Sequence, residues 1–219
     1  MKAATSIGKY FIFLFLLILL SSCLGVKADI VLNSDGSGTI ALEYLVSKSL
    51  DSLGKLDGNE RWNTIPVGQA DFERTLDRLP DIKLLSFSSR EDAKNVIVSA
   101  KMEFHSVSGL LAFLDASGRQ TSFSGDGSSG RLVMTLNEAK QTNNTDLDKL
   151  IKGICEGYYY KMSFSFPDEG SLTIYNKQDK PLAAIQGSEI HDKGKNVSCS
   201  FPIYEVFSSA DGMKLVFQW

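Results

Sequence analysis

Short segments in which apolar and polar residues alternate restrict the fold of this chain more than any other feature. Along residues 158–166 every second side chain is large and apolar, and residues 39–46 repeat the pattern. An alternation with a period of two indicates a strand that buries one face. The dipeptide Asp35-Gly36 stands between segment 39–46 and an earlier apolar segment, 29–33, and it predicts a hairpin turn. The chain is therefore expected to be rich in β-structure.

Three other segments carry apolar residues at helical spacing, and helices are predicted there. They are residues 68–79, which end before Pro80, residues 106–114, and residues 146–156, which end before Gly157. About ten strands are expected between and around them. The predicted strands cover residues 29–33, 39–46, 82–87, 96–104, a short stretch around 123, 131–136, 158–166, 171–175, 182–185, 196–201 and 213–219.

This order of elements predicts an α+β fold, because most strands follow one another through short turns and the helices are few. We expect an antiparallel sheet, or sheets, with about three helices packed on one face as a two-layer sandwich. Residues 28–219 are expected to form a single domain, since Gly and Ser occur as turn residues rather than as one long linker. The alternative is two subdomains that meet in the Gly- and Ser-rich segment 118–130.

The first 22 residues have the pattern of an export signal. Lys2 and Lys9 precede Tyr10–Leu20, a run without one charged residue, and small residues follow it. This order is typical of a secretory signal peptide. The apolar run is shorter than the roughly 20 residues that a membrane-spanning helix needs. The remaining alternatives are an ordinary signal with an incidental cysteine and a buried N-terminal helix.

The end of this segment, Leu20-Ser21-Ser22-Cys23, resembles the lipobox of bacterial lipoproteins. The resemblance implies that the sulfur of Cys23 receives a diacylglycerol, that residues 1–22 are removed, and that the new amine is acylated. Residues 23–27 would then form a short lipidated tether. Each buried methylene contributes about 0.8 kcal/mol, so that two or three acyl chains hold a protein firmly on a membrane.

A second resemblance covers Ala28–Asn33 with Asp35–Gly38, and Asn59–Asn63 through Ser86–Ser88 with the strand that follows. These stretches are similar to spirochaete lipoproteins and, more distantly, to the LppM-like domain of actinobacterial lipoproteins. The resemblance implies an α+β sandwich related to lipid-binding folds, a role in the cell envelope and no known catalysis. It carries no motif of binding residues that can be transferred to this chain.

The charge of the exported part argues against nucleic acid as a partner. The whole sequence holds 23 Lys and Arg and 26 Asp and Glu. Removal of Lys2 and Lys9 with the signal leaves 21 against 26, a net charge of −5. Binding to nucleic acid depends on clustered cations. A mildly acidic domain offers no such general attraction.

The sequence contains no recognisable catalytic or metal-binding motif. The two histidines, His105 and His191, are isolated, and no Cys-x-x-Cys pair occurs. The Gly-x-Ser-x-Gly elbow of serine hydrolases is missing as well. We therefore expect no metal, no cofactor and no enzymatic activity. A hydrolase without a recognisable motif is the remaining alternative.

Two cysteines remain if Cys23 is lipidated. Cys155 closes a predicted helix and Cys199 lies in a predicted strand. In an oxidising compartment the two could form a disulfide. They could equally be two separate buried thiols, because two cysteines do not reveal their own connectivity.

The aromatic residues allow two interpretations. They can fill a core, or they can line an apolar groove for an acyl chain between a curved sheet and its helices. Trp62 stands in a polar segment, where it could contact a ligand, contact the membrane surface or simply be packed.

These features together predict a membrane-anchored envelope lipoprotein that faces the periplasm or the cell exterior. Its expected role is non-catalytic, the binding of a lipid or another apolar ligand. The first alternative is an adaptor that binds an envelope protein through an exposed sheet edge or through segment 118–130.

Overall fold

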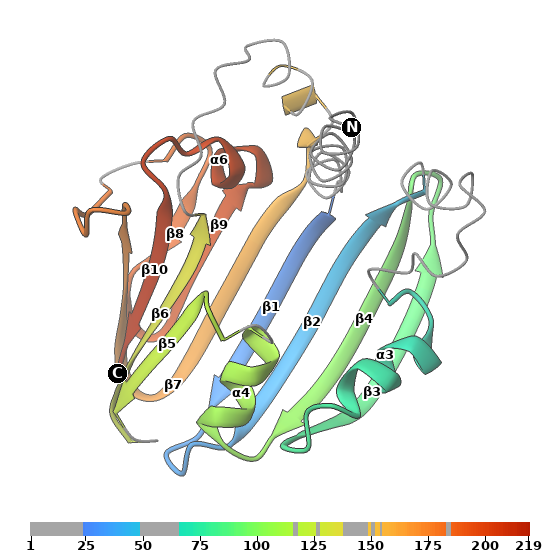
Figure 1. Cartoon of the computed structure of the whole chain (residues 1–219), viewed down its shortest axis with the longest axis horizontal. Coiled ribbons are helices and arrows are strands. Elements are labelled where there is room, and N and C mark those ends of the chain that lie inside the picture. Colours follow the sequence, from blue (N-terminus) through green and yellow to red (C-terminus); the bar gives the residue numbers. More distant parts are fainter. Residues whose placement is uncertain are drawn as a thin grey trace, which may run out of the picture.

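The computed structural model describes residues 24–48, 66–115, 118–125, 128–137, 149, 152–153, 155–182 and 185–219. The described chain forms ten strands and three named helices (Figure 1). Their bounds are β1 (Leu24–Leu32), β2 (Gly38–Ser47), α3 (Gln69–Leu76), β3 (Ile82–Glu91), β4 (Asn95–Phe104), α4 (Val107–Leu114), β5 (Thr121–Gly125), β6 (Gly130–Asn137), β7 (Tyr159–Tyr175), β8 (Glu189–His191), β9 (Lys193–Pro202), α6 (Ile203–Ser208) and β10 (Met213–Gln218).

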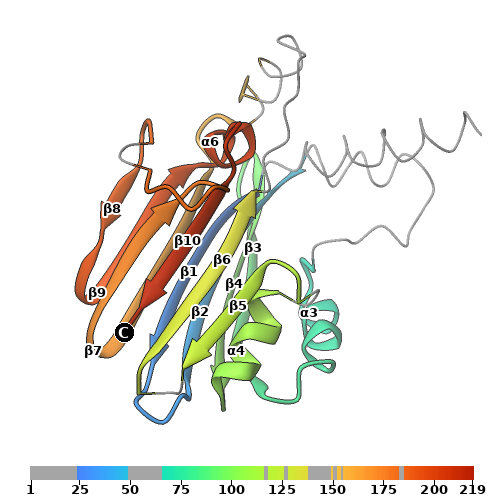
Figure 2. The ribbon, with the colours of Figure 1, turned by 60° about the vertical axis from the view of Figure 1, so that its left-hand side comes forward.

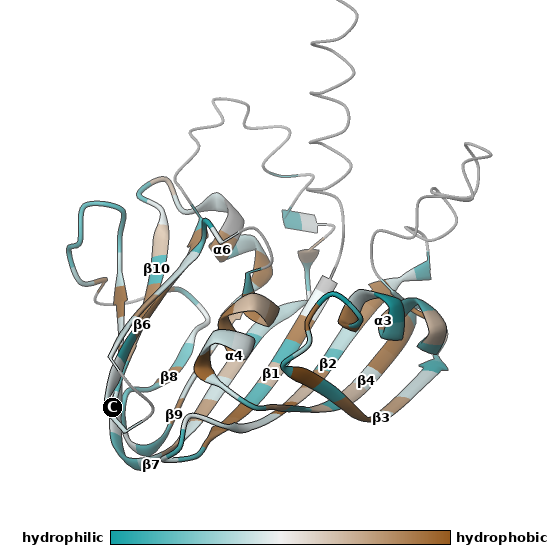
Figure 3. Cartoon of the chain, turned by 60° about the horizontal axis from the view of Figure 1, so that its bottom comes forward, coloured by the Kyte–Doolittle hydropathy of each residue, from teal (hydrophilic) through white to brown (hydrophobic). Residues whose placement is uncertain are grey.

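All ten strands belong to one sheet, in which eight run in the order β3-β4-β2-β1-β7-β10-β6-β5. β9 pairs with β7 outside this path, and β8 pairs with β9. β5 and β6, on either side of residues 126–127, are thus continuous with the rest of the sheet. Figures 2 and 3 show that the sheet curves into a trough. We call the side of the trough that holds α3 and α4 the inner face.

The bend of the sheet comes from β7, the longest strand with 17 residues. Its first part, residues 160–165, pairs in parallel with β1, and its last part, residues 171–175, pairs antiparallel with β10. The register with β9 shifts between Ser165 and Gly170. At Gly170 a Cβ atom would overlap the ring of Phe166, so the close approach at this bend needs glycine.

Two predictions about the sheet are therefore wrong. The sheet is mixed, because β1 and β7 are parallel. More than a hundred residues separate these strands, so no tight turn forces them to be antiparallel. The predicted strands 158–166 and 171–175 are one strand, β7, which bends sharply at the turn signal Pro167–Gly170, where the register with β9 shifts.

The helices α3 and α4 confirm the predictions for 68–79 and 106–114, and both lie over the inner face (Figure 3). Ser106 caps α4, because its Oγ accepts a hydrogen bond from the Gly109 N–H at 3.0 Å and donates to Asp81 at 2.7 Å. α6 connects β9 to β10 at one end of the strands. Most of the predicted helix 146–156 falls outside the described residues.

The buried core follows the predicted alternation. Phe164 and Phe217 are fully buried, and their ring centroids are 4.4 Å apart. Phe166 stacks on Trp219 with centroids 5.1 Å apart, so the last residue of the chain is part of the packing. These large apolar side chains thus pack against one another where β7 lies beside β10.

Leu24–Lys27 are the first four residues of β1, where the sequence analysis expected a tether. Leu24 pairs with Val46 of β2, and Val26 lies between Tyr44 of β2 and Tyr160 of β7. The segment is too short to show an alternation in the sequence, but two neighbouring strands supply its hydrogen-bond partners. The sheet therefore begins directly after Cys23.

The short strand β8 was not predicted. The three residues of β8 are all exposed, so they carry no alternation that the sequence could reveal. The predicted strand 182–185 lies partly outside the described residues, and Pro181 just before it forms an isolated bridge with Tyr175. The short strand expected around residue 123 is confirmed as β5.

Candidate functional site

The predicted site residues Cys23 and Trp62 lie outside the described residues. The chain that follows Cys23 is well defined, because Leu24 starts β1 in the middle of the sheet. The ends of β2, β4 and β3 follow one another beside this start, since Leu24 pairs with Val46, Ser47 with Asn95, and Glu91 with Val96. We call this end of the sheet the anchor end.

Polar contacts hold the strands together at the anchor end. The Lys48 N–H donates to the carbonyl oxygen of Lys94 at 2.8 Å, and the Lys48 ammonium forms an ion pair with Glu91 at 2.8 Å. The Tyr158 hydroxyl donates to Asn95 Oδ1 at 2.7 Å. The start of β7 is therefore attached to the start of β4 across the sheet.

The two remaining cysteines are both buried thiols in the structure. Cys199 lies on β9, opposite Met162 of β7. Burial raises the pKa of Cys199 to about 12, although a hydrogen bond with the Met162 backbone acts in the opposite direction. At neutral pH this thiol is protonated and a poor nucleophile. The disulfide between Cys155 and Cys199 stays a prediction.

A shallow depression of about 340 Å³ lies on the outer face of the sheet, opposite the helices. Small side chains such as Ala41, Ser88 and Ser99 form its floor, and longer charged ones form its rim. The residues around it are Lys27, Asp29, Ala41, Leu42, Glu43, Ser86, Phe87, Ser88, Ser99, Ala100 and Lys101. They come from β1, β2, β3 and β4, so the depression exists only in the folded sheet. Leu42, Phe87 and Ala100 alternate with the others along their strands, so their side chains lie on the inner face.

A network of polar contacts crosses this depression and its border. Lys27 Nζ lies 2.8 Å from Asp29 Oδ2, and the Ser163 hydroxyl donates to Asp29 Oδ1 at 2.7 Å. Ser99 Oγ donates a longer hydrogen bond, 3.4 Å, to Glu43. Partial burial raises the pKa of Asp29, but the hydrogen bonds from Lys27 and Ser163 outweigh it and leave this pKa below its ordinary value. The same contacts with Asp29 raise the pKa of Lys27.

We expect a Ser163→Ala variant to raise the pKa of Asp29 toward its ordinary value, because the variant removes one of the two hydrogen bonds that favour the carboxylate. A carbon-13 NMR titration of the carboxyl group measures this change. Ser165→Ala is the matched control, since the Ser165 hydroxyl donates to Asn196. Because the folded pKa is lowered, Asp29 contributes stability above its ordinary pKa, and this contribution is lost as the pH falls through the lowered value. An unchanged Asp29 titration in Ser163→Ala would contradict the assignment.

The depression is lined by small, polar and charged side chains. None of its lining residues is a histidine or a cysteine. Of its serines, Ser99 donates a hydrogen bond to Glu43, and Ser86 and Ser88 are exposed. Both signs of charge are present at the rim, which suits a partner with several polar groups.

The alternation of Ser99, Lys101 and Glu103 with apolar neighbours predicts that these residues share a face, but it does not predict which strands lie beside them.

The described residues contain no group of three or more potential metal ligands. His105 follows β4 and His191 ends β8, and both are exposed. None of the helices in the described part of the chain has the length and hydrophobicity needed to span a bilayer.

No protein-family model matches the sequence, and no curated protein matches it significantly. Among solved structures, the chain is similar to the folded domain of the LppM protein from Mycobacterium tuberculosis, which was determined by NMR. The match covers 90% of this chain and 91% of that domain, with 13% sequence identity and a TM-score of 0.44. The function of this chain therefore has to be derived from its own residues.

Proposed function

We propose that this protein is a bacterial envelope lipoprotein, anchored by lipid at Cys23, whose folded domain binds an apolar ligand without catalysis. The position of β1 is the observation that supports the proposed lipid anchor. Its first residue, Leu24, follows the lipobox cysteine directly and stands at an open end of the sheet. An acylated cysteine directly before Leu24 would therefore reach a membrane without unfolding a strand.

The curved inner face supports the choice of an apolar ligand. Beside the fully buried core, it carries apolar side chains that are only partly buried, among them Val26, Leu42 and Tyr160 on the central strands. Phe87 of β3 and Leu111 of α4 extend this lining toward the helices. A concave apolar surface with few polar groups is the usual form of a site for an acyl chain. The charged depression on the outer face is not suited to such a ligand.

Native mass spectrometry of the protein extracted from its host membranes tests this function. We expect a chain that begins at Cys23, that carries covalent acyl groups and that retains a non-covalent lipid. Leu42→Ser on the inner face should reduce the lipid-bound species, whereas Val31→Ser, an exposed residue of β1, should not. Thermal unfolding of both variants shows whether they are folded. A bound protein in place of the lipid would favour the adaptor, and a chain without acyl groups would contradict the anchor.

A further inference from the structure

We propose that the anchor end of the sheet lies against the lipid headgroups, so that the strands run away from the membrane. This inference rests on the proposed lipidation of Cys23, and it goes further by assigning the surface that contacts the bilayer.

The first step is the length of chain between the lipid and the sheet. Consecutive Cα atoms are about 3.8 Å apart, so Cys23 can lie no further than this from the first residue of β1. Leu24 is already paired with Val46, and Val26 is held between β2 and β7. The lipidated residue is therefore joined to a central strand without any flexible spacer. The lipid must emerge at this end of the sheet.

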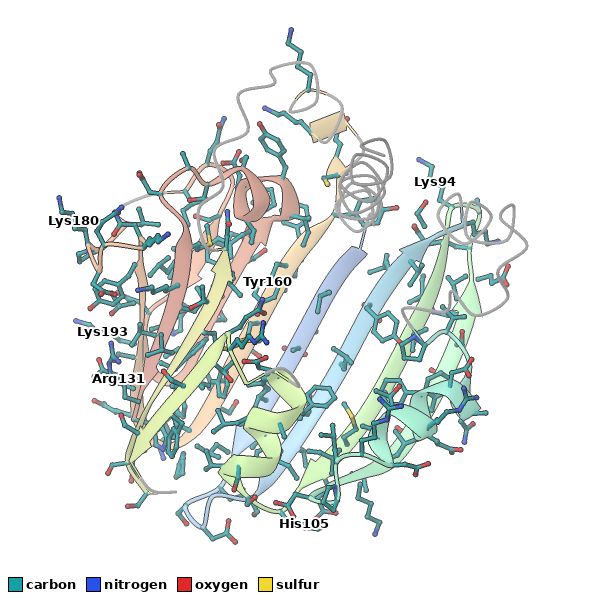
Figure 4. All side chains as sticks on the ribbon, in the orientation of Figure 1. Lys94, His105, Arg131, Tyr160, Lys180 and Lys193 are labelled. Atoms are coloured by element: carbon teal, nitrogen blue, oxygen red, sulfur yellow. The ribbon has the colours of Figure 1, made fainter. Side chains whose placement is uncertain are left out.

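Second, this orientation places one end of the strands near the membrane and the other end far from it. The turn between β3 and β4, which contains Lys94, lies at the anchor end, together with the start of β7 and α6. The turn between β1 and β2 and the residue after β4, His105, lie at the opposite end. Figure 4 labels Lys94 and His105 at these two ends of the strands.

The third step is the chemistry of the side chains at the anchor end. Tyr159 is 39% exposed, and the ammonium group of Lys161 lies 5.4 Å from its ring centroid. Lys152 lies at the same distance, 5.4 Å, from the ring of Tyr204 on α6. Tyrosine and lysine side chains have an apolar body and a polar tip, and both are favoured in the headgroup layer.

The acidic groups at this end do not oppose the contact. Glu91 is paired with Lys48, and the Asp92 carboxylate accepts hydrogen bonds from the backbone N–H groups of Lys94 and Asn95 at 2.7 Å. Glu156, Glu189, Glu205 and Asp211 are further acids at this end in the described part of the chain. Because these acids offset the cations, the contact depends on the lipid anchor and on amphipathic side chains rather than on net charge.

The test compares two variants of the lipidated full-length protein that each gain one exposed cysteine, Lys94→Cys and His105→Cys. Each is labelled with a thiol-reactive fluorophore and placed in phosphatidylcholine vesicles that carry a rhodamine-labelled headgroup lipid. Cys155 and Cys199 are buried, and the unsubstituted protein measures any background labelling. We expect quenching by rhodamine to be several-fold stronger at position 94 than at position 105.

Equal quenching at the two positions, or stronger quenching at position 105, would overturn the orientation while leaving the anchor intact. Incorporation of labelled fatty acid into the same preparations separates this result from a failure of the proposed function. If no fatty acid is incorporated, the anchor and the orientation are both wrong.

Discussion

Replacement of Phe164 by alanine should lower the free energy of unfolding by about 3–5 kcal/mol, the range measured for buried aromatic residues truncated to alanine. Phe164 is fully buried on β7, between Ile30 of β1 and Val197 of β9. Its ring centroid is 4.4 Å from that of Phe217 and 5.5 Å from that of Phe166. The truncation would remove the ring that joins the strands on both sides of the bend and would leave a cavity.

Urea unfolding of the variant, followed by near-ultraviolet circular dichroism, measures this loss. Ser165→Ala is the control on the same strand, because Ser165 points to the other face and its exposed hydroxyl donates to Asn196. This control should change the free energy of unfolding by less than about 0.5 kcal/mol. A loss below about 1 kcal/mol in Phe164→Ala would show that the aromatic cluster is not the core of the fold.

Replacement of Gly38 by valine should destabilise the first hairpin by about 3 kcal/mol or more, at the upper end of the usual cost of overpacking. A Cβ atom at Gly38 would overlap the carbonyl oxygen of Val31 and the ring of Phe104. Phe104 is fully buried, so its ring cannot move aside without disturbing the core. The conflict is steric, at the point where β2 lies between β1 and β4.

Gly68→Ser is the matched control for this substitution. A Cβ at Gly68 has only Asp71 Oδ2 nearby, at 3.7 Å, and Gly68 occupies the N-cap of α3, where serine is favoured. The control should leave the melting temperature unchanged or slightly higher, while Gly38→Val lowers it strongly. Equal melting temperatures in the two variants would contradict the close packing between Gly38 and Phe104.

Much of the fold can be predicted from local patterns in the sequence. The Asp35-Gly36 hairpin, the alternation in β4 and β7, and the two helices before Pro80 and after Ser106 all depend on residues close together in the chain. The parallel pairing of β1 with β7 could not be predicted in this way. It depends on the burial of two faces that lie far apart in the sequence, and no turn residue signals it.

The candidate sites also combine local features, which the sequence predicts, with features that depend on pairing between distant strands. The resemblance to a lipobox depends on four neighbouring residues before Leu24, so the prediction for Cys23 can be made from sequence alone. The start of β1 at Leu24 could not, because Leu24-Gly25-Val26-Lys27 acquires its strand structure from pairing with β2 and β7. The outer depression with Lys27 and Asp29 needs four strands in a specific register, which the alternation of each strand does not specify.

The most direct test of the lipid anchor compares the wild-type chain with Cys23→Ser in fractionated host cells grown with labelled fatty acid. The wild type should sediment with the membranes and carry the label. Cys23→Ser should do neither, because serine offers no sulfur for the thioether, whereas Ser22→Ala, which keeps a small residue before the cysteine, should behave as the wild type. Membrane-bound Cys23→Ser together with an unlabelled wild type would contradict the account.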